Sequence, residues 1–236
     1  MDYKEHYRID AEEFDYWGED QFSLTEKRRN QYTFKLANIR AGQKVLDIGS
    51  GRGWFSLHAA SCNADTTAVD LSQTNLERIN QSDDRVKTLL ADAINTGAEA
   101  GSYDLVVALE VLEHITNPKQ ALQHWASLLK PDGRLLITVP YKEKLRYELC
   151  IHCNKKTPHS AHLHSFNKES ICALIRSSGL RVVSTSLFCH KLMQFLHLDM
   201  LTHRLPYLVW RFFDAISALS GDKYNYIAVE CRRGKH

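Results

Sequence analysis

The stretch VLDIGSGRG, residues 45–53, joins an apolar run to three glycines at alternate positions, and Trp54 then begins a run with helical character. Gly49, Gly51 and Gly53 allow the chain to turn tightly and to bring its backbone against a ligand. A strand that passes through such a loop into a helix is typical of nucleotide-binding α/β units. The stretch therefore predicts an α/β fold whose ligand lies against this loop.

Short apolar runs rich in Val, Ile and Leu recur along the chain, and their lengths suit strands buried on both faces of a parallel sheet. The expected strands cover residues 44–48, 66–70, 85–90, 104–109, 134–139, 180–186 and 224–232. The expected helices cover residues 54–62, 72–80, 117–129 and 167–178, and residues 130–133 (KPDG) are expected to form a turn. This alternation predicts a doubly wound α/β sheet in a single domain over residues 1–236.

Three segments lie outside this alternation. Residues 1–40 form an N-terminal arm and a first helix, residues 141–165 are dense in Cys and His, and residues 187–220 carry apolar residues at helical spacing. The last two segments are expected to be insertions in the latter half of the fold. Arg28 and Arg29 are expected on a solvated helix face, with contact to a cofactor carboxylate as the alternative.

Composition excludes several classes of protein. Lys+Arg 30 against Asp+Glu 28 gives a net charge of +2, which disfavours a dedicated nucleic-acid binder. The first residues lack the apolar core of a signal peptide, and no apolar run approaches the roughly 18 residues that span a bilayer. Six cysteines in such a chain favour free thiols or metal ligands over disulfides. We expect a cytoplasmic protein; its oligomeric state is left open.

Acidic residues at strand ends indicate which ligand the loop binds. Asp70 ends the second expected strand and Asp92 follows the third, so both are expected at the edge of the sheet where ligands bind. A carboxylate in the position of Asp70 accepts hydrogen bonds from the hydroxyls of a ribose. The loop spacing is GxGxG instead of the dinucleotide GxGxxG, and Asp47 precedes it. Because a carboxylate repels a pyrophosphate and suits an ammonium group, S-adenosylmethionine is favoured over NAD.

In these segments the chain resembles the class I S-adenosylmethionine-dependent methyltransferases, in particular a type 11/23-like small-molecule group. VLDIGSGRG is similar to their first motif, AVDLS to their acidic second strand, LLADA to their adenine-contacting loop and YDLVVALEVLEHITNP to their fourth-strand motif. The resemblance implies a Rossmann-like sheet of seven mostly parallel strands, the last one antiparallel. It also implies a cofactor site in which Asp47, Gly49 and Gly51 contact the methionine part, Asp70 the ribose, Asp92 with Ala93 the adenine, and Glu110 the reactive end. Ser50, Gly53 and Leu71 complete that predicted site.

Methyl transfer needs a base only where the acceptor must lose a proton. His114, in LEHI, follows the fourth strand near the expected methyl group and is the first candidate; the alternative is that it orients this loop. The phrase AHLHSFN is similar to a segment of relatives in which a histidine lines the pocket. This makes His162 or His164 a second candidate.

The Cys/His segment predicts a zinc site. Cys150 and Cys153 have CxxC spacing, and histidines follow within a dozen residues, which suits a tetrahedral site of thiolates and imidazoles. The expected ligands are Cys150, Cys153, His159 and His162, and a His162 that binds zinc is not the base. Solvated or pocket histidines are one alternative, and a redox CxxC pair is another.

These features predict a methyltransferase that acts at oxygen on a small molecule, a saccharide or a lipid-linked acceptor. A protein or RNA methyltransferase is the alternative enzyme, and a catalytically silent cofactor-binding subunit is the alternative without activity. Within residues 187–220, Leu208, Phe212, Ile216 and Leu219 form an apolar stripe flanked by Trp210 and Phe213. Such a stripe either packs on the sheet or lies at a membrane surface as peripheral contact.

Overall fold

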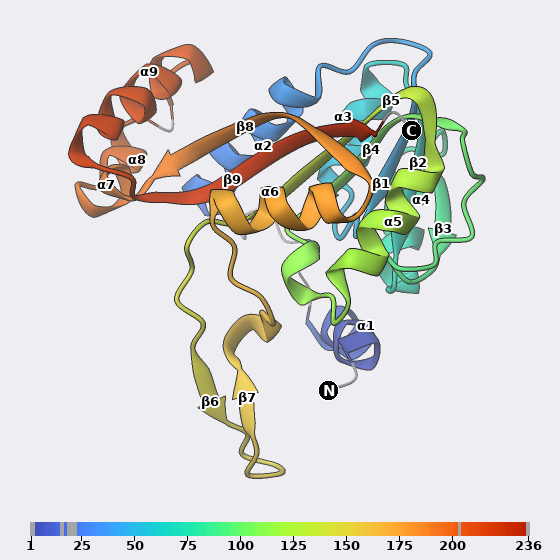
Figure 1. Ribbon diagram of the computed structural model, residues 1–236, viewed down its shortest axis with the longest axis horizontal. Coiled ribbons are helices and arrows are strands. Elements are labelled where there is room, and N and C mark those ends of the chain that lie inside the picture. Colours follow the sequence, from blue (N-terminus) through green and yellow to red (C-terminus); the bar gives the residue numbers. More distant parts are fainter. Residues whose placement is uncertain (1–2, 15–16, 18–22, 203, 235–236) are drawn as a thin grey trace.

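A computed structural model describes residues 3–14, 17, 23–202 and 204–234 (Figure 1). The expected N-terminal arm therefore lies partly outside the described residues. Its described part contains two helices, α1 (Tyr3–Glu13) and α2 (Leu24–Ala37). No helix among the described residues has the length and apolar character needed to cross a membrane.

The central sheet has seven strands in the order β3-β2-β1-β4-β5-β9-β8. β9 is antiparallel to both of its neighbours, and the remaining pairs are parallel. The doubly wound α/β sheet with an antiparallel last strand is therefore confirmed. The strands are β1 (Lys44–Ile48), β2 (Asp65–Asp70), β3 (Lys87–Leu90), β4 (Tyr103–Leu109), β5 (Leu129–Pro140), β8 (Leu180–His190) and β9 (Tyr224–Arg233).

The helices that connect the strands begin at residues suited to the first turn. Ser72 accepts a hydrogen bond from the backbone of Asn75 at the start of α4, and Asn117 caps α5, whose first residue is Pro118. Such caps satisfy backbone groups that have no partner within the helix. The connecting helices are α3 (Trp54–Ser61), α4 (Gln73–Ser82), α5 (Pro118–Leu128) and α6 (Lys168–Ser177).

Alternate strand residues pack into two cores on opposite faces of the sheet. One core joins the strands to α5 and α6 through Trp125 and Ile171. The other joins them to α2, α3 and α9 (Tyr207–Ser217) through Tyr32, Phe55 and Trp210. Because both faces are covered, continuous apolar strands are buried, as the runs in the sequence predict.

The structure changes three expected boundaries. Residues 130–133 belong to β5 instead of forming a turn. β8 continues to His190, so the helical insertion begins only at Lys191, the first residue of α7 (Lys191–Phe195). Residues 141–165 contain a hairpin of β6 (Tyr147–Leu149) and β7 (Lys156–Pro158), followed by the short helix η2 (His159–Ala161). Figure 1 shows this hairpin projecting away from the sheet.

The helices of the second insertion gather beyond one end of β8 and β9 (Figure 1). They are α7, α8 (Leu198–Thr202) and α9, followed by the short helix η3 (Ala218–Ser220). Trp210, one of the two residues expected to flank the apolar stripe, packs inward and is 1% exposed. The Arg28 guanidinium lies 5.5 Å from its ring. Leu208 and Phe212 of α9 and Leu219 of η3 are exposed.

Candidate active site

The glycine loop turns sharply between β1 and α3. Gly49 and Gly53 have φ angles of +69° and +68°, in the left-handed region that favours glycine. A Cβ atom at Gly49 would lie 2.6 Å from Val111, and one at Gly53 would lie 2.4 Å from Ile79. Glycine is thus required here both by backbone conformation and by close packing.

A cavity of about 390 Å³ lies against this loop at the carboxyl ends of the strands. The residues predicted to bind the cofactor line it, with the exception of Gly53. The lining includes Asp47, Gly49, Ser50, Gly51, Asp70, Leu71, Asp92, Ala93 and Glu110. Gly53 instead precedes α3 and serves the packing against α4. The structure therefore gathers nine of the ten predicted cofactor residues around one space.

Two carboxyl groups lie beneath the loop, that of Asp47 buried and that of Asp70 half-buried. Burial raises the pKa of Asp47 to about 7, although the Ser56 hydroxyl donates a 2.6 Å hydrogen bond to it. Burial likewise raises the pKa of Asp70, which accepts hydrogen bonds from the backbone of Ser72 and Gly51 at 2.9 Å and 2.7 Å. Burial penalises the ionised form of both carboxyl groups. A cationic ligand in the cavity would favour that ionised form and would in turn be stabilised by it. An anionic pyrophosphate would be repelled.

Glu110 stands directly after β4 and has a φ angle of +59°. Its side chain is paired with Arg29 of α2 at 3.7 Å. The Arg29 guanidinium also lies 5.3 Å from the ring centre of Tyr226. The expectation that Arg28 and Arg29 lie on a solvated helix face is wrong. Arg28 is 5% exposed, and the Arg29 side chain is 20% exposed in its ion pair with Glu110.

A second cavity of about 600 Å³ adjoins the first. The two share Arg29, Glu110 and His114 in their linings. The second cavity extends from these residues over the segment that follows β5 and reaches His162 and Tyr226. A ligand at the glycine loop and a second molecule in the adjoining cavity would therefore meet beside Glu110 and His114.

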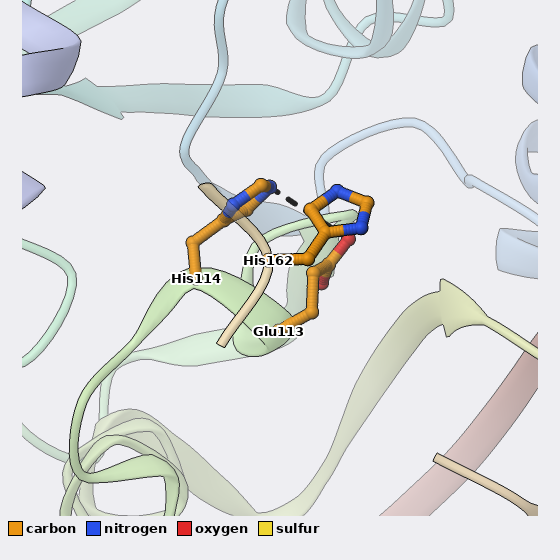
Figure 2. Close-up of side chains that lie close together, drawn as sticks. All are labelled: Glu113, His114 and His162. Carbon is orange, nitrogen blue, oxygen red and sulfur yellow. Dashed lines mark ion pairs between the residues drawn. The ribbon is translucent and has the colours of Figure 1, made fainter. Parts of the chain in front are cut away.

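Three side chains converge near this junction: Glu113, His114 and His162 (Figure 2). Each offers one ligand atom, and these atoms lie within 4.8 Å of one another. Glu113 and His114 belong to the short helix η1 (Leu112–His114), whereas His162 follows η2. The backbone brings these elements together, because Leu163 and His164 both donate hydrogen bonds to the Glu113 carbonyl. A carboxylate and two imidazoles form a ligand set that suits a divalent transition metal.

The charges in this cluster are set mainly by burial. Glu113 is fully buried, and neither of its carboxyl oxygens has a hydrogen-bond partner among the described residues. Burial, followed by repulsion from Glu110, raises the pKa of Glu113 well above its usual value. Burial and the neighbouring His162 lower the pKa of His114 to about 4, so His114 is neutral at pH 7. The hydroxyl of Tyr7, in α1, is hydrogen-bonded to His114 Nδ1.

The two further candidate bases differ in their surroundings. His162 Nδ1 lies 2.5 Å from a carboxylate oxygen of Glu143, which leaves Nε2 as the ring atom able to accept a proton. His164 Nε2 is hydrogen-bonded to the carbonyl of Ile115 at 2.9 Å, and His164 does not line either cavity. The geometry therefore favours His162 over His164.

The four predicted zinc ligands do not come together. Cys150 and Cys153 lie in the turn of the hairpin, where backbone N–H groups and the Cys153 thiol lower the pKa of Cys150. His159 Nδ1 lies 2.7 Å from Glu148, and His162 is held by Glu143. In the described part of the chain, His162 thus groups with Glu113 and His114 instead of with the thiols.

Three residues of this site were not predicted from the sequence: Tyr7, Glu113 and Glu143. Arg29 entered the sequence analysis only through the alternative of contact with a cofactor carboxylate. The sequence contains one indication of Glu113, because this residue adjoins the candidate base His114 in the segment LEH. Tyr7 and Glu143 are brought in by contacts across 107 and 19 positions of the chain. Such contacts leave no local pattern.

The strand order, the glycine loop and the acids at the strand ends define a class I S-adenosylmethionine-dependent methyltransferase fold. A family model described as a methyltransferase domain (type 23) matches residues 19–185. The chain belongs to this methyltransferase family.

Two curated relatives illustrate the range of this family. The ubiquinone biosynthesis O-methyltransferase of Xanthomonas axonopodis pv. citri is 30% identical over 160 residues, which are 62% of this chain and 66% of that protein. The 27-O-demethylrifamycin SV methyltransferase of Amycolatopsis mediterranei is 33% identical over 132 residues, which are 52% of this chain and 48% of that protein. The chain thus spans 66% and 48% of the length of these two relatives.

Solved structures agree with the fold. An S-adenosylmethionine dependent methyltransferase from Mesorhizobium loti has a TM-score of 0.64 at 16% identity, covering 89% of this chain and 100% of that one. The 1,6-didemethyltoxoflavin-N1-methyltransferase of Burkholderia thailandensis has a TM-score of 0.63 at 17% identity, covering 98% of this chain and 85% of that one. At these identities the similarity shows the fold alone.

Proposed function

We propose that the protein transfers the methyl group of S-adenosylmethionine to a hydroxyl oxygen of a small molecule. The observation that carries this proposal is the meeting of two cavities beside Glu110 and His114. The first cavity has the glycine loop and buried carboxyl groups that suit the cofactor, and the second has room for an acceptor. The names of the curated relatives support transfer to oxygen on small molecules.

The residues of the first cavity fit this cofactor. Asp47 is buried and Asp70 half-buried, both have raised pKa values, and a cation bound beside them would stabilise their ionised forms. Gly49 and Gly51 bring backbone close to the ligand without side chains in the way. When bound, S-adenosylmethionine supplies a methyl group on a sulfonium, an activated electrophile.

The protein contributes mainly by holding the reactants in position. Alignment of two reactants can provide up to about 7–11 kcal/mol in well-oriented systems. Arg29 and Glu110, paired at 3.7 Å, form part of the wall common to both cavities. α1 adds Tyr7 to the wall of the first cavity, which limits access of water to the junction.

A hydroxyl acceptor must also lose its proton, and we assign this step to His162. Glu143 holds Nδ1 at 2.5 Å and orients the ring, as a carboxylate does for the histidine of a catalytic triad. Nε2 of His162 would take the hydroxyl proton as the acceptor oxygen bonds to the methyl carbon, whose bond to the cofactor sulfur would break and leave S-adenosylhomocysteine. His114 is a weaker base because its pKa is lowered to about 4.

Labelled S-adenosylmethionine, purified protein and a set of hydroxylated acceptors test this proposal. We expect His162→Gln to lower kcat about 100-fold or more, the usual contribution of a general base. Glu143→Gln should lower kcat less, because it weakens the contact that orients the ring but leaves Nε2 in place. His159→Gln is the matched control, since His159 lies in the same segment but is bonded to Glu148. Full activity of His162→Gln would refute the assignment, and turnover of any acceptor would exclude a catalytically silent subunit.

The same cluster has a second candidate role, because Glu113, His114 and His162 also form a ligand set for a divalent cation. The buried carboxyl group of Glu113, which has no hydrogen-bond partner among the described residues, favours this role, since a bound cation would stabilise its ionised form. A cation there would polarise the acceptor hydroxyl and replace the need for a base.

Elemental analysis separates this role from the predicted zinc site in the hairpin. Protein expressed in medium rich in zinc and magnesium is compared with Glu113→Gln and with Cys150→Ser. Metal lost only in Glu113→Gln assigns the cation to the cluster, and metal lost only in Cys150→Ser assigns zinc to the thiols. Absence of metal from the wild type, with activity that resists a chelator, leaves His162 as the base.

A further inference from the structure

We propose that the acceptor carries an anionic group, a phosphate ester or a carboxylate, bound at the second cavity by Lys144, Arg146 and Lys191. This rests on the proposed function of that cavity as the acceptor site. The proposal names the substrate class by charge, a property that neither the fold nor the names of the relatives specify.

The second cavity is lined by cationic side chains that come from three separate segments. They are Arg29 of α2, Lys142, Lys144 and Arg146 of the segment after β5, and Lys191 at the start of α7. The carboxyl groups in the lining are those of Glu110, Glu113 and Glu143. The positive groups therefore outnumber the negative ones, in a chain whose total charge is only +2.

The acidic groups of the lining are already engaged or buried. Glu110 pairs with Arg29, and Glu143 bonds with His162. Glu113 is fully buried. None of these carboxyl groups neutralises the remaining cations of the cavity.

Three of the cationic side chains in the lining form no ion pair with an acidic group of the described residues. Lys142 is bonded to Asp222 at 2.5 Å. Within the described part of the chain, Lys144, Arg146 and Lys191 have no ion pair to an acidic group. All three are exposed at the rim of the cavity. Like charges gathered around one space repel each other, and an anion bound between them would relieve that repulsion.

The lining of the second cavity is less apolar than that of the first. Its apolar residues are Pro140, Tyr141, Leu145 and Tyr226, whereas sites for apolar ligands are lined mostly by hydrophobic side chains. Lysine and arginine donate charge-assisted hydrogen bonds to phosphate and carboxylate oxygens. The cavity thus suits a polar acceptor whose hydroxyl lies at the Glu113–His114–His162 cluster and whose anionic group lies at the rim.

Binding is tested first, without any methyl transfer. Inorganic phosphate and sodium acetate are titrated separately into ¹⁵N-labelled full-length protein at low salt, and backbone amide shifts are followed. We expect shifts centred on Lys144, Arg146 and Lys191, with the stronger response identifying the preferred anion. The triple variant Lys144→Gln, Arg146→Gln, Lys191→Gln should bind at least about tenfold more weakly, since charge-assisted hydrogen bonds are lost. Because these side chains are exposed, the affinity should also fall as salt rises.

The control is Lys119→Gln with Lys168→Gln, which removes exposed lysines from α5 and α6 that line neither cavity. Lys191→Gln alone, on a separate element from the other two, guards against a folding defect in the triple variant and should weaken binding in part. The proposal is overturned if neither anion shifts these amides, or if the triple variant and the control bind equally well.

Transfer of labelled methyl groups then distinguishes this proposal from the proposed function. Hydroxylated acceptors are compared in pairs, such as 3,4-dihydroxybenzoate with 3,4-dihydroxybenzyl alcohol, and glucose 6-phosphate with glucose. We expect the charged member to have the lower KM, and the triple variant to remove that preference. Turnover without such a preference overturns the anionic acceptor and leaves the methyltransferase intact. Site-specific anion binding without turnover of any acceptor supports the cationic rim and counts against the proposed function.

Discussion

Glu113 shows how a single residue can be costly to the fold and useful to the site. A buried carboxyl group without hydrogen-bond partners is unfavourable in its ionised form, and here both oxygens of Glu113 lack a partner among the described residues. Burial, followed by repulsion from Glu110, raises the pKa of the group well above its usual value, which favours the protonated form. A ligand that brings positive charge to the cluster would reverse that balance.

The pH dependence of stability follows from this pKa. Between the usual value of 4.5 and the higher pKa of the folded protein, folded Glu113 keeps a proton that the unfolded chain releases. The unfolded state then binds fewer protons, so the free energy of unfolding falls as pH rises through that range. We expect Glu113→Gln to reduce this fall in thermal unfolding of the cofactor-free protein between pH 5 and pH 8. Glu169→Gln, at an exposed position of α6, should leave it as in the wild type. Equal pH dependence in all three proteins would show that Glu113 is ionised in the fold.

Residues that follow a strand directly were predictable, and residues brought in from distant elements were not. Asp47, Asp70 and Asp92 lie at strand ends whose apolar runs are visible in the sequence, and all three line the first cavity. Tyr7 reaches His114 from an N-terminal helix that no sequence pattern placed near the site. Burial of Glu113 depends on the segment around His164 packing against η1, which local periodicity does not encode.

At the scale of elements, the turn between β1 and α3 depends on two different properties of glycine. Gly51 has a φ angle of +50° and open space where a Cβ atom would lie, whereas at Gly53 that atom would meet Ile79 at 2.4 Å. We expect Gly51→Ala to cost about 1–2 kcal/mol of stability through backbone strain alone. Gly53→Ala should cost about 1–3 kcal/mol more through overpacking against α4. Chemical denaturation measures both, and equal losses would show that Ile79 moves away without cost.

The predicted boundaries of elements were wrong where the local sequence pattern and the backbone hydrogen bonds differ. The KPDG segment has turn residues, yet Leu129 still pairs with Tyr103 of β4, so β5 begins before the segment and a register shift absorbs it. β8 runs to His190 because β9 continues beside it as far as Tyr224. In both cases a neighbouring strand extends an element beyond its local pattern.

At the scale of the whole molecule, one end carries an exposed apolar surface. We propose that this end contacts an anionic membrane surface. On α9 and η3, Leu208, Phe212 and Leu219 are 77%, 60% and 89% exposed. Exposed Lys191 and Arg204 lie in the same insertion. Apolar side chains together with basic residues are what an interfacial helix presents to anionic lipids.

Co-sedimentation tests this membrane contact. We expect the wild type to pellet with phosphatidylglycerol vesicles and to be released at high salt, since the basic residues are exposed. Leu208→Ser with Phe212→Ser should abolish pelleting without unfolding the chain, because both side chains lie on the exposed face of α9. Leu149→Ser, at an exposed site in the projecting hairpin, is the matched control. Wild-type protein that stays in solution with these vesicles would contradict the proposal.

The central claim is that the cavity at the glycine loop binds S-adenosylmethionine through the acids at the strand ends. Isothermal titration calorimetry with S-adenosylmethionine tests it most directly, using the wild type, Asp70→Ala, and Asp65→Ala as a control. Asp65 lies at the opposite end of β2 and pairs with exposed Lys87. We expect one site in the wild type and in Asp65→Ala, and a loss of about 1.5–3 kcal/mol in Asp70→Ala, the range of a charge-assisted hydrogen bond. A wild type that binds NAD but not S-adenosylmethionine, or an Asp70→Ala variant with unchanged affinity, would contradict the account.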